Sequence, residues 1–577
     1  MLANYPNLSR VTEVLDSYLA TRYPNHFGPE PTHPFANLKK FKVIHDNLWG
    51  TNRFSWRELL VMDSPILQRL RDIHQTGLAY YVYPSARHSR FEHCLGVTTV
   101  ASRVFDSLVE RQPELFDNFA KTLDGGGPTS ALIQRLRSEL RLAALLHDAG
   151  HSMHSHTSEL VYSDIPMLQA AAKELTKLAG HAKNKGKGEV LSFCLSQTRA
   201  VRDLLARGQT KLLDGNGTDV VKMDNVSLLI IGRSGHPYTQ FLADIISSDF
   251  DADKLDYLLR DAASAGLPLR YDLERYLSTV RVEPEYVADD EQHLLRLYES
   301  LGVAAKRESA GAHSAFEHYD SFVLRLPRQA MSTIEQIVIC KFMLYSYIYH
   351  HRKVRAAEGL LARLLRRAVC SWRSAGMGDE ALICKFLDLV DPSLHWPEFT
   401  AHKDNRVSGY CGRLITRQLP REIFGFVPNM FTHLRAEVIK DFTSRLLDPD
   451  QKKRAAAIAE FEESFGRELL KRNRGLGETW EEALLTAGAW LDAPTAPKFE
   501  NVNLMVGARS GADNPIPLSS VFPIQSWIQA YEAHRYNVRV FAFSEYADDA
   551  CICAKAAMKH VLKIDDTEFY DSMVKPR

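Results

Sequence analysis

One apolar segment that ends in an adjacent His–Asp pair constrains this chain more than any other feature. The segment SALIQRLRSELRLAALLHDAG repeats apolar residues at helical spacing and predicts an amphipathic helix that ends at His147 and Asp148. Two polar side chains at the inner end of a buried helix carry a free-energy cost unless other groups satisfy them. The fold must therefore bring partners for this pair from elsewhere in the chain.

Two distant stretches carry suitable partners. RHSRFEHCLGV contains His93, and SSDFDADKLDYLLRDA contains Asp253. Alone, the second stretch is explained as an acid-rich helix start, but that explanation does not account for three such clusters in one chain. Imidazole nitrogen and carboxylate oxygen atoms together suit divalent cations such as Mn, Fe, Zn or Mg. We interpret His93, His147, Asp148 and Asp253 as a metal site with open coordination positions, as catalysis requires.

The remaining sequence predicts a mainly α fold. Helical periodicity dominates residues 46–400, with strand-like alternation at 279–283 and 321–326 that predicts a small β-hairpin. Residues 1–45 form an N-terminal extension, and residues 401–577 mix helical and strand-like patterns. We therefore expect a helical body with a smaller α+β C-terminal part.

Composition restricts the partners of the chain. Lys and Arg together number 71, as do Asp and Glu, so a phosphate-binding surface must be a local cluster. The 8 cysteines include no CxxC pair and fit a reducing compartment. The sequence has neither a signal-peptide pattern nor an apolar run of the ~20 residues that a membrane helix needs. These features predict a cytoplasmic protein without a membrane partner, and they leave nucleic-acid binding open.

The motifs resemble the HD-domain superfamily, which is named after its adjacent His-Asp metal ligands. The closer resemblance is to its deoxynucleoside triphosphate (dNTP) triphosphohydrolase branch and covers residues from about 64 to 370. It rests on SPILQRLRDIHQTGLAYYVYPSARHSRFEHCLGV, HDAGHSMHSH and DADKLDYLLRDA. This resemblance identifies 46–400 as an HD phosphohydrolase domain and leaves 401–577 for regulation or oligomerisation.

The resemblance also implies roles for individual residues. His93, His147, Asp148 and Asp253 would hold the divalent metal, which is Mn, Fe, Mg or Zn. His151 and His156 would lie around the α-phosphate, and Glu159 would orient a catalytic histidine. The implied substrate contacts are Arg90 and Lys341 to phosphate, Lys254 and Tyr257 on the phosphate and sugar sides, and Gln75 and Asp261 to the sugar.

The family reaction attacks the α-phosphorus of a dNTP and releases a deoxynucleoside and inorganic triphosphate. The resemblance thus implies a nucleotide substrate, an allosteric nucleotide and a homo-oligomer. Arginine and lysine residues also follow the helical pattern at 352–367. They are interpreted either as a solvated helix face or as a phosphate pocket or subunit interface.

Two positions depart from the family pattern. Gly188 stands where the family has a histidine beside the cleaved phosphate, in a Lys/Gly-rich insert, KNKGKGE, that predicts an exposed loop. Either His151, His154 or His156 replaces that histidine, or turnover is slow. Thr76 stands where a bulkier leucine helps to exclude the ribose 2′-hydroxyl. The alternatives are therefore an HD phosphohydrolase acting on another nucleotide, a signalling nucleotide or a nucleic-acid end, or a nucleotide sensor with little turnover.

Overall fold

The structure of the chain is a computed structural model. It describes residues 1–28, 38–180, 186–213, 221–285, 321–426, 445–446, 451–494, 505–507, 516–517, 522–524, 526–527, 530 and 538–563.

The described residues are mainly helical, which confirms the predicted fold class. The N-terminal and central elements are α1 (Pro6–Arg22), α2 (Pro24–Phe27), β1 (Phe41–Asp46), β2 (Gly50–Ser55), α3 (Trp56–Met62), α4 (Pro65–Gln68), α5 (Arg90–Arg111), α6 (Pro113–Leu123), α7 (Thr129–Leu146), α8 (His156–Tyr162), α9 (Pro166–Ala179), α10 (Lys187–Gln197), α11 (Arg199–Leu213), α12 (Met223–Ile230), α13 (Gln240–Ile246), α14 (Ala252–Ala265) and α15 (Leu273–Thr279). The later elements are β3 (Arg281–Glu285), β4 (Ser321–Pro327), α17 (Met331–Leu344), α18 (Arg352–Ser374), α19 (Asp379–Asp388), η7 (Asp391–His395), α20 (Pro397–Thr400), α21 (Asn405–Ile415), β5 (Arg421–Phe426), α23 (Gln451–Arg472), α24 (Trp480–Ala487), β6 (Trp490–Asp492), β7 (Met505–Gly507), β8 (Ile516–Pro517), β9 (Val538–Ala542) and α26 (Ala547–Leu562).

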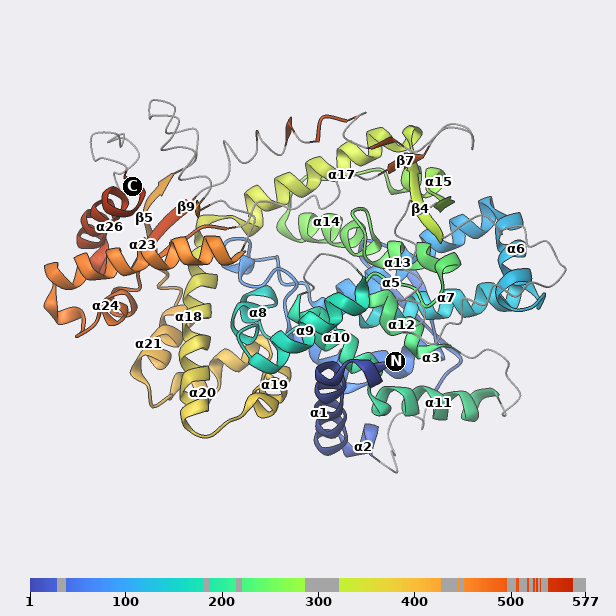
Figure 1. The fold of residues 1–577 in the computed structure, drawn as a ribbon, viewed down its shortest axis with the longest axis horizontal. Coiled ribbons are helices and arrows are strands. Elements are labelled where there is room, and N and C mark those ends of the chain that lie inside the picture. Colours follow the sequence, from blue (N-terminus) through green and yellow to red (C-terminus); the bar gives the residue numbers. More distant parts are fainter. Residues whose placement is uncertain are drawn as a thin grey trace.

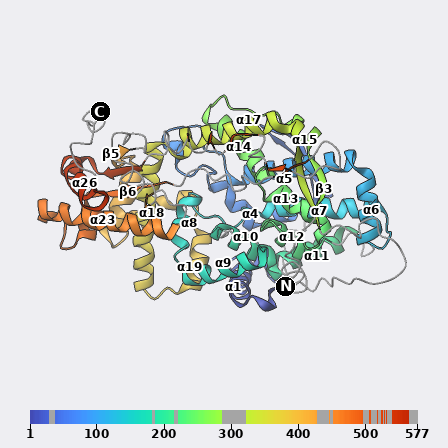
Figure 2. The same cartoon turned by 45° about the horizontal axis from the view of Figure 1, so that its top comes forward.

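Helices α5, α7 and α14 form the centre of the helical body. Helix α5 packs against both α7 and α14, and α17 runs beside α14 in both views (Figures 1 and 2). The three central helices contribute apolar residues to one large core, among them Val97, Leu140 and Leu255, which are fully buried. Burial of apolar area holds these helices together, so their polar ends can carry other chemistry.

The predicted hairpin is present and belongs to a larger sheet. Strands β3 and β4 pair antiparallel, with Val282 opposite Leu324. Strand β7 then pairs parallel with β4, and β8 pairs with β7, so that the sheet order is β3-β4-β7-β8. Strands from beyond residue 500 therefore complete a sheet that begins in the helical body.

The C-terminal part has a second core. Strands β5, β9 and β6 form an antiparallel sheet, and α23, α24 and α26 pack with it around buried residues such as Phe461 and Val540 (Figure 1). This arrangement is the α+β mixture that the sequence predicts.

Helix α18 connects the body to this C-terminal part. Its Arg355 forms an ion pair with Asp492, and Arg363 pairs with Glu462 at 3.1 Å. The solvated-face interpretation is therefore wrong for these two arginines, because acidic side chains from the distant C-terminal part approach them. Within the described residues, no helix combines the length and the apolarity needed to span a membrane.

Candidate active site

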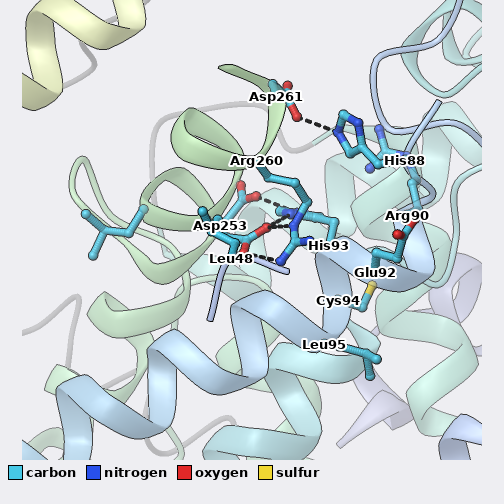
Figure 3. A network of polar contacts seen from close by, with 12 residues as sticks. Leu48, His88, Arg90, Glu92, His93, Cys94, Leu95, Asp253, Arg260 and Asp261 are labelled. Carbon is cyan, nitrogen blue, oxygen red and sulfur yellow. Dashed lines mark hydrogen bonds and ion pairs between the residues drawn. The ribbon is translucent and has the colours of Figure 1, made fainter. Parts of the chain in front are cut away.

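His93 enters the site from the first turn of α5. Ser89 caps this helix: its hydroxyl accepts from the backbone N–H of Glu92, and the Glu92 carboxylate accepts from the backbone N–H of Ser89 at 2.6 Å. This reciprocal capping box begins the helix at Arg90, so that His93 lies one turn inside it. His93 is fully buried, and Figure 3 shows it facing Asp253.

Asp256 positions the His93 ring, a role that the sequence did not reveal. Its Oδ2 atom lies 2.8 Å from Nδ1 of His93, while Arg260 and the indole N–H of Trp49 donate to the same carboxylate. A β-carbon at Gly96 would lie 2.0 Å from Asp256 Oδ1, so glycine is required there. Fixing Nδ1 in this way turns Nε2 toward the cluster, as metal-binding histidines require.

His147 and Asp148 follow the last turn of α7. The Nδ1 atom of His147 hydrogen-bonds to the Ala144 carbonyl at 2.7 Å, so Nε2 again faces the cluster. Asp148 lies beside both histidines, 3.4 Å from His147 Nε2 and 3.7 Å from His93 Nε2. Asp148 is thus satisfied by a group from another segment, Arg90, whereas His147 keeps its Nε2 atom for a further partner.

Asp253 completes the group from the first turn of α14. Its Oδ1 atom lies 3.0 Å from His93 Nε2 and 3.8 Å from His147 Nε2. Ligand atoms of these three residues lie within 4.8 Å of one another, yet neither Nε2 atom makes a hydrogen bond to any described residue. Buried, unsatisfied imidazole nitrogens beside carboxylates fit a divalent cation, so these residues could hold a metal ion.

The charges of the site support the same conclusion. Burial lowers the pKa of His93, but the carboxylates of Asp253 and Asp256 beside the ring outweigh burial and raise the pKa to about 10. Burial raises the pKa of Asp253, but the neighbouring imidazoles of His147 and His93 bring it well below its usual range. The cluster therefore carries a negative potential that favours a cation.

A second arrangement lies next to Asp148. Nε2 of His151 is 3.1 Å from Asp148 Oδ1, and Nδ1 of His151 is 2.9 Å from Glu159 Oε1. Glu159 also contacts His156 at 3.2 Å, and the His156 side chain is 77% exposed. The structure therefore brings together the three proposed catalytic residues, with Glu159 between the two histidines.

Gly188 lies directly against this arrangement. A β-carbon there would be 2.2 Å from Glu159 Oε1 and 3.0 Å from His151 Cε1. The predicted exposed loop is wrong for Gly188, which is buried in the first turn of α10, while residues 183–185 of that stretch lie outside the described residues. No larger side chain fits there without displacing the His151–Glu159 pair. His154, another candidate replacement, lies beside Asp391 instead.

Two predicted phosphate and sugar contacts have unsatisfied atoms at the site. Arg90 is 1% exposed, forms an ion pair with Asp148 and donates from Nε to Ser155 at 2.7 Å. Its Nη2 atom and Oε1 of Gln75 are buried without a hydrogen bond to any described residue. Both groups therefore retain polar atoms that a ligand could satisfy.

The other predicted contacts are already engaged within the protein or buried. Lys254 donates to the Ser248 carbonyl at 2.7 Å and to Asp251. Asp261 accepts from His88, as Figure 3 shows, and from the Tyr349 hydroxyl. Tyr257, on the same helix, is half-buried, and burial holds the pKa of its hydroxyl well above the usual range. Lys341 is buried on α17.

Comparisons with known proteins agree with the motifs. No family model matches the chain. It is 29% identical over 258 residues to deoxynucleoside triphosphate triphosphohydrolase SAMHD1 of Homo sapiens. This match covers 43% of this chain and 37% of that protein. It is also 26% identical over 330 residues to the uncharacterized protein MJ1154 of Methanocaldococcus jannaschii. That match covers 57% of this chain and 50% of that protein.

The fold has a counterpart among solved structures. A hypothetical protein from Aquifex aeolicus matches with a TM-score of 0.53 and 19% identity, over 89% of this chain and 100% of that one. The chain spans half or less of the length of the curated relatives named above. The matches confirm the resemblance to the HD-domain dNTP triphosphohydrolase branch and support a hydrolase.

Proposed function

We propose that the chain hydrolyses deoxynucleoside triphosphates to deoxynucleosides and inorganic triphosphate with a divalent metal ion. The observation that carries this proposal is the convergence of His93, His147 and Asp253 beside the His151–Glu159 pair. A metal site alone is compatible with many reactions. An imidazole held by a carboxylate next to that site adds a group that can move a proton.

The residues of the chain would share the reaction as follows. Arg90 holds a phosphate oxygen through its unsatisfied Nη2 atom, and Gln75 contacts the sugar side. Water loses a proton to solvent and forms a bond to the α-phosphorus while the bond from phosphorus to the 5′-oxygen breaks. His151 donates a proton to that leaving oxygen, and Glu159 holds the ring in place. His156, which is exposed next to Glu159, contacts the phosphate chain.

A divalent ion held by His93, His147, Asp148 and Asp253 would neutralise phosphoryl charge and acidify water. In this structure, Asp148 is also the partner of Arg90 and His151. Substrate phosphate that draws Arg90 toward itself would release Asp148 from this pairing.

Thr76 favours a second candidate, in which a ribonucleotide is accepted. The Thr76 hydroxyl is buried and donates to the Ala86 carbonyl at 3.3 Å. The side chain is shorter than the leucine of the family pattern, so it would exclude a ribose 2′-hydroxyl less strongly. Ribonucleoside triphosphates are therefore the competing substrate class.

We also propose that a nucleotide regulates the activity in a cytoplasmic homo-oligomer. The supporting observation is a cluster of cations around Lys353. Burial lowers the pKa of its ammonium, and so do the nearby charges of Arg352, Arg417 and Arg421, which outweigh the opposing charge of Glu422. Such a cluster favours a bound phosphate chain.

Product analysis by anion-exchange chromatography tests the proposal. The full chain is incubated with Mn²⁺ or Mg²⁺ and each dNTP alone, then with the four in mixture, and with the matching ribonucleotides. Deoxynucleoside and intact triphosphate that are lost in His147→Ala/Asp148→Ala support the proposal, and activity only in the mixture supports regulation. Ribonucleoside products favour the second candidate, and no product from either class contradicts both.

A further inference from the structure

A second group of histidines and a carboxylate lies outside the candidate active site. It consists of His74, His154 and Asp391, whose ligand atoms lie within 4.8 Å of one another. His74 follows the short turns after α4, His154 belongs to the loop between α7 and α8, and Asp391 begins η7. Three segments that are distant in the sequence therefore supply one donor each.

Hydrogen bonding explains two of these residues but not the third. Asp391 accepts from the backbone N–H groups of His74 and His154 and contacts Nδ1 of His74. The His154 ring is 1% exposed, and neither of its nitrogens makes a hydrogen bond to any described residue. Leaving a buried polar group unsatisfied costs roughly 1–3 kcal/mol, so this ring needs another partner.

The distances in this group suit a shared cation. Nδ1 of His154 lies 3.4 Å from Asp391 Oδ2. Two ligands bound to one tetrahedral zinc ion at ~2.0–2.1 Å lie roughly 3.3–3.4 Å apart. His74 and Asp391 are in hydrogen-bond contact and would separate when an ion enters. The His74 side chain is 22% exposed, which leaves a route from solvent.

We propose that His74, His154 and Asp391 form a second divalent-metal site, separate from the one that contains the His–Asp pair. Two imidazoles and one carboxylate favour Zn²⁺, Co²⁺ or Fe²⁺ over Mg²⁺, and water completes the coordination. The site is a structural support for the loop that follows the His–Asp pair.

The position of the site gives it an effect on the active site. His154 and Ser155 have φ angles of 50° and 55°, in the left-handed region that residues other than glycine rarely adopt. Ser155 accepts a hydrogen bond from Arg90 at 2.7 Å and donates to the His74 carbonyl at 2.7 Å. An ion that joins His74 to His154 would therefore hold the strained turn that positions Arg90.

Metal stoichiometry tests this proposal without relying on activity. The full chain is stripped with a chelator and titrated with Co²⁺, and bound metal is measured by equilibrium dialysis and mass spectrometry. We expect two equivalents for the wild type and one each for His147→Ala/Asp148→Ala and His154→Phe. His395→Phe, at an exposed histidine of η7 that belongs to no candidate metal group among the described residues, is the matched control and should retain both equivalents.

Two results of the metal titration would contradict the second site. One equivalent in the wild type that His147→Ala/Asp148→Ala removes, or a metal content that His154→Phe leaves unchanged, would overturn the second site. If His154→Phe does not fold, His74→Gln and the wild-type stoichiometry decide the question. Dialysis of the stripped protein also separates this proposal from the proposed function, because it requires no turnover.

Discussion

Two histidine–carboxylate groups take residues from the loop 147–155 between α7 and α8, and they differ in how their rings are held. In the first, Nδ1 of His93 faces Asp256 and Nδ1 of His147 faces a backbone carbonyl. Both Nε2 atoms therefore already point at Asp253. In the second, the ring of His74 contacts the carboxylate that would be its fellow ligand, and the ring of His154 is held by no hydrogen bond to a described residue.

This difference teaches that ligand types alone do not define a metal site. The first group is organised by its supporting hydrogen bonds, so an ion would bind with little rearrangement. The second must separate His74 from Asp391 before an ion can enter. We therefore expect the first site to bind divalent cations more tightly, and the following predictions break or sharpen that contrast.

Asp253→Ala should have the largest effect. It removes the carboxylate that faces both histidines of the first group, so the first site should lose its metal ion. Without the metal, nucleotide hydrolysis should fall by at least ~1000-fold. Bound Co²⁺ should drop by one equivalent, leaving the second site loaded. Asp106→Ala, which removes an exposed partner of Arg137, is the control and should keep full activity. A residual activity within tenfold of wild type would contradict the assignment of the first group.

Asp256→Asn should have the next largest effect. The single amide oxygen can still accept at the Oδ1 position from Arg260 Nη2 and Trp49, but an NH2 group then replaces the oxygen that faces His93 Nδ1. Loss of such a support typically costs 10–100-fold in metal affinity or activity, so we expect a decrease of about that size. Co²⁺ titration should show weakened binding at the first site and unchanged binding at the second. Equal weakening at both sites would indicate a general loss of structure.

Gly188→Ala should reduce turnover by about tenfold. Its β-carbon would displace Glu159 from His151 without touching the metal-facing histidines, so metal content should stay unchanged. Gly409→Ala is the matched control, because the added β-carbon has nothing within 4 Å in helix α21. Steady-state kinetics on both variants check the prediction. Equal kcat values would mean that the pairing of His151 with Glu159 does not limit the reaction.

Local patterns predicted much of the architecture and the first group. The apolar run before His147 predicted the helix that delivers it, and alternation at 279–283 and 321–326 predicted the β3–β4 pair. These features depend on neighbours in the sequence, which is why they can be read from it. The distant pairing of β7 with β4 depends on contacts between far segments and could not be read in the same way.

The parts that were missed depend on tertiary contacts. Asp256 follows Asp253 in an acid-rich helix start, and nothing local distinguishes a ring-supporting carboxylate from a solvated one. The lysine and glycine neighbours of Gly188 predict an exposed loop, yet close approach to His151 buries it. His154 and His74 are separated by 79 intervening residues, and only the fold brings them to Asp391.

Ser155→Ala should produce the smallest effect, because it breaks the connection between the two groups without removing a ligand from either. The Arg90 guanidinium would lose the acceptor at 2.7 Å but keep its ion pair with Asp148. We expect KM for the nucleotide to rise by about threefold while both metal equivalents remain, since a retained ion pair offsets much of a lost hydrogen bond. Ser163→Ala, at an exposed hydroxyl after α8, is the control. If the second site positions Arg90 through Ser155, removing metal from that site in the wild type should raise KM by a similar factor and should have no further effect in Ser155→Ala. An additive effect of the two changes would show that the second site acts on Arg90 by another route.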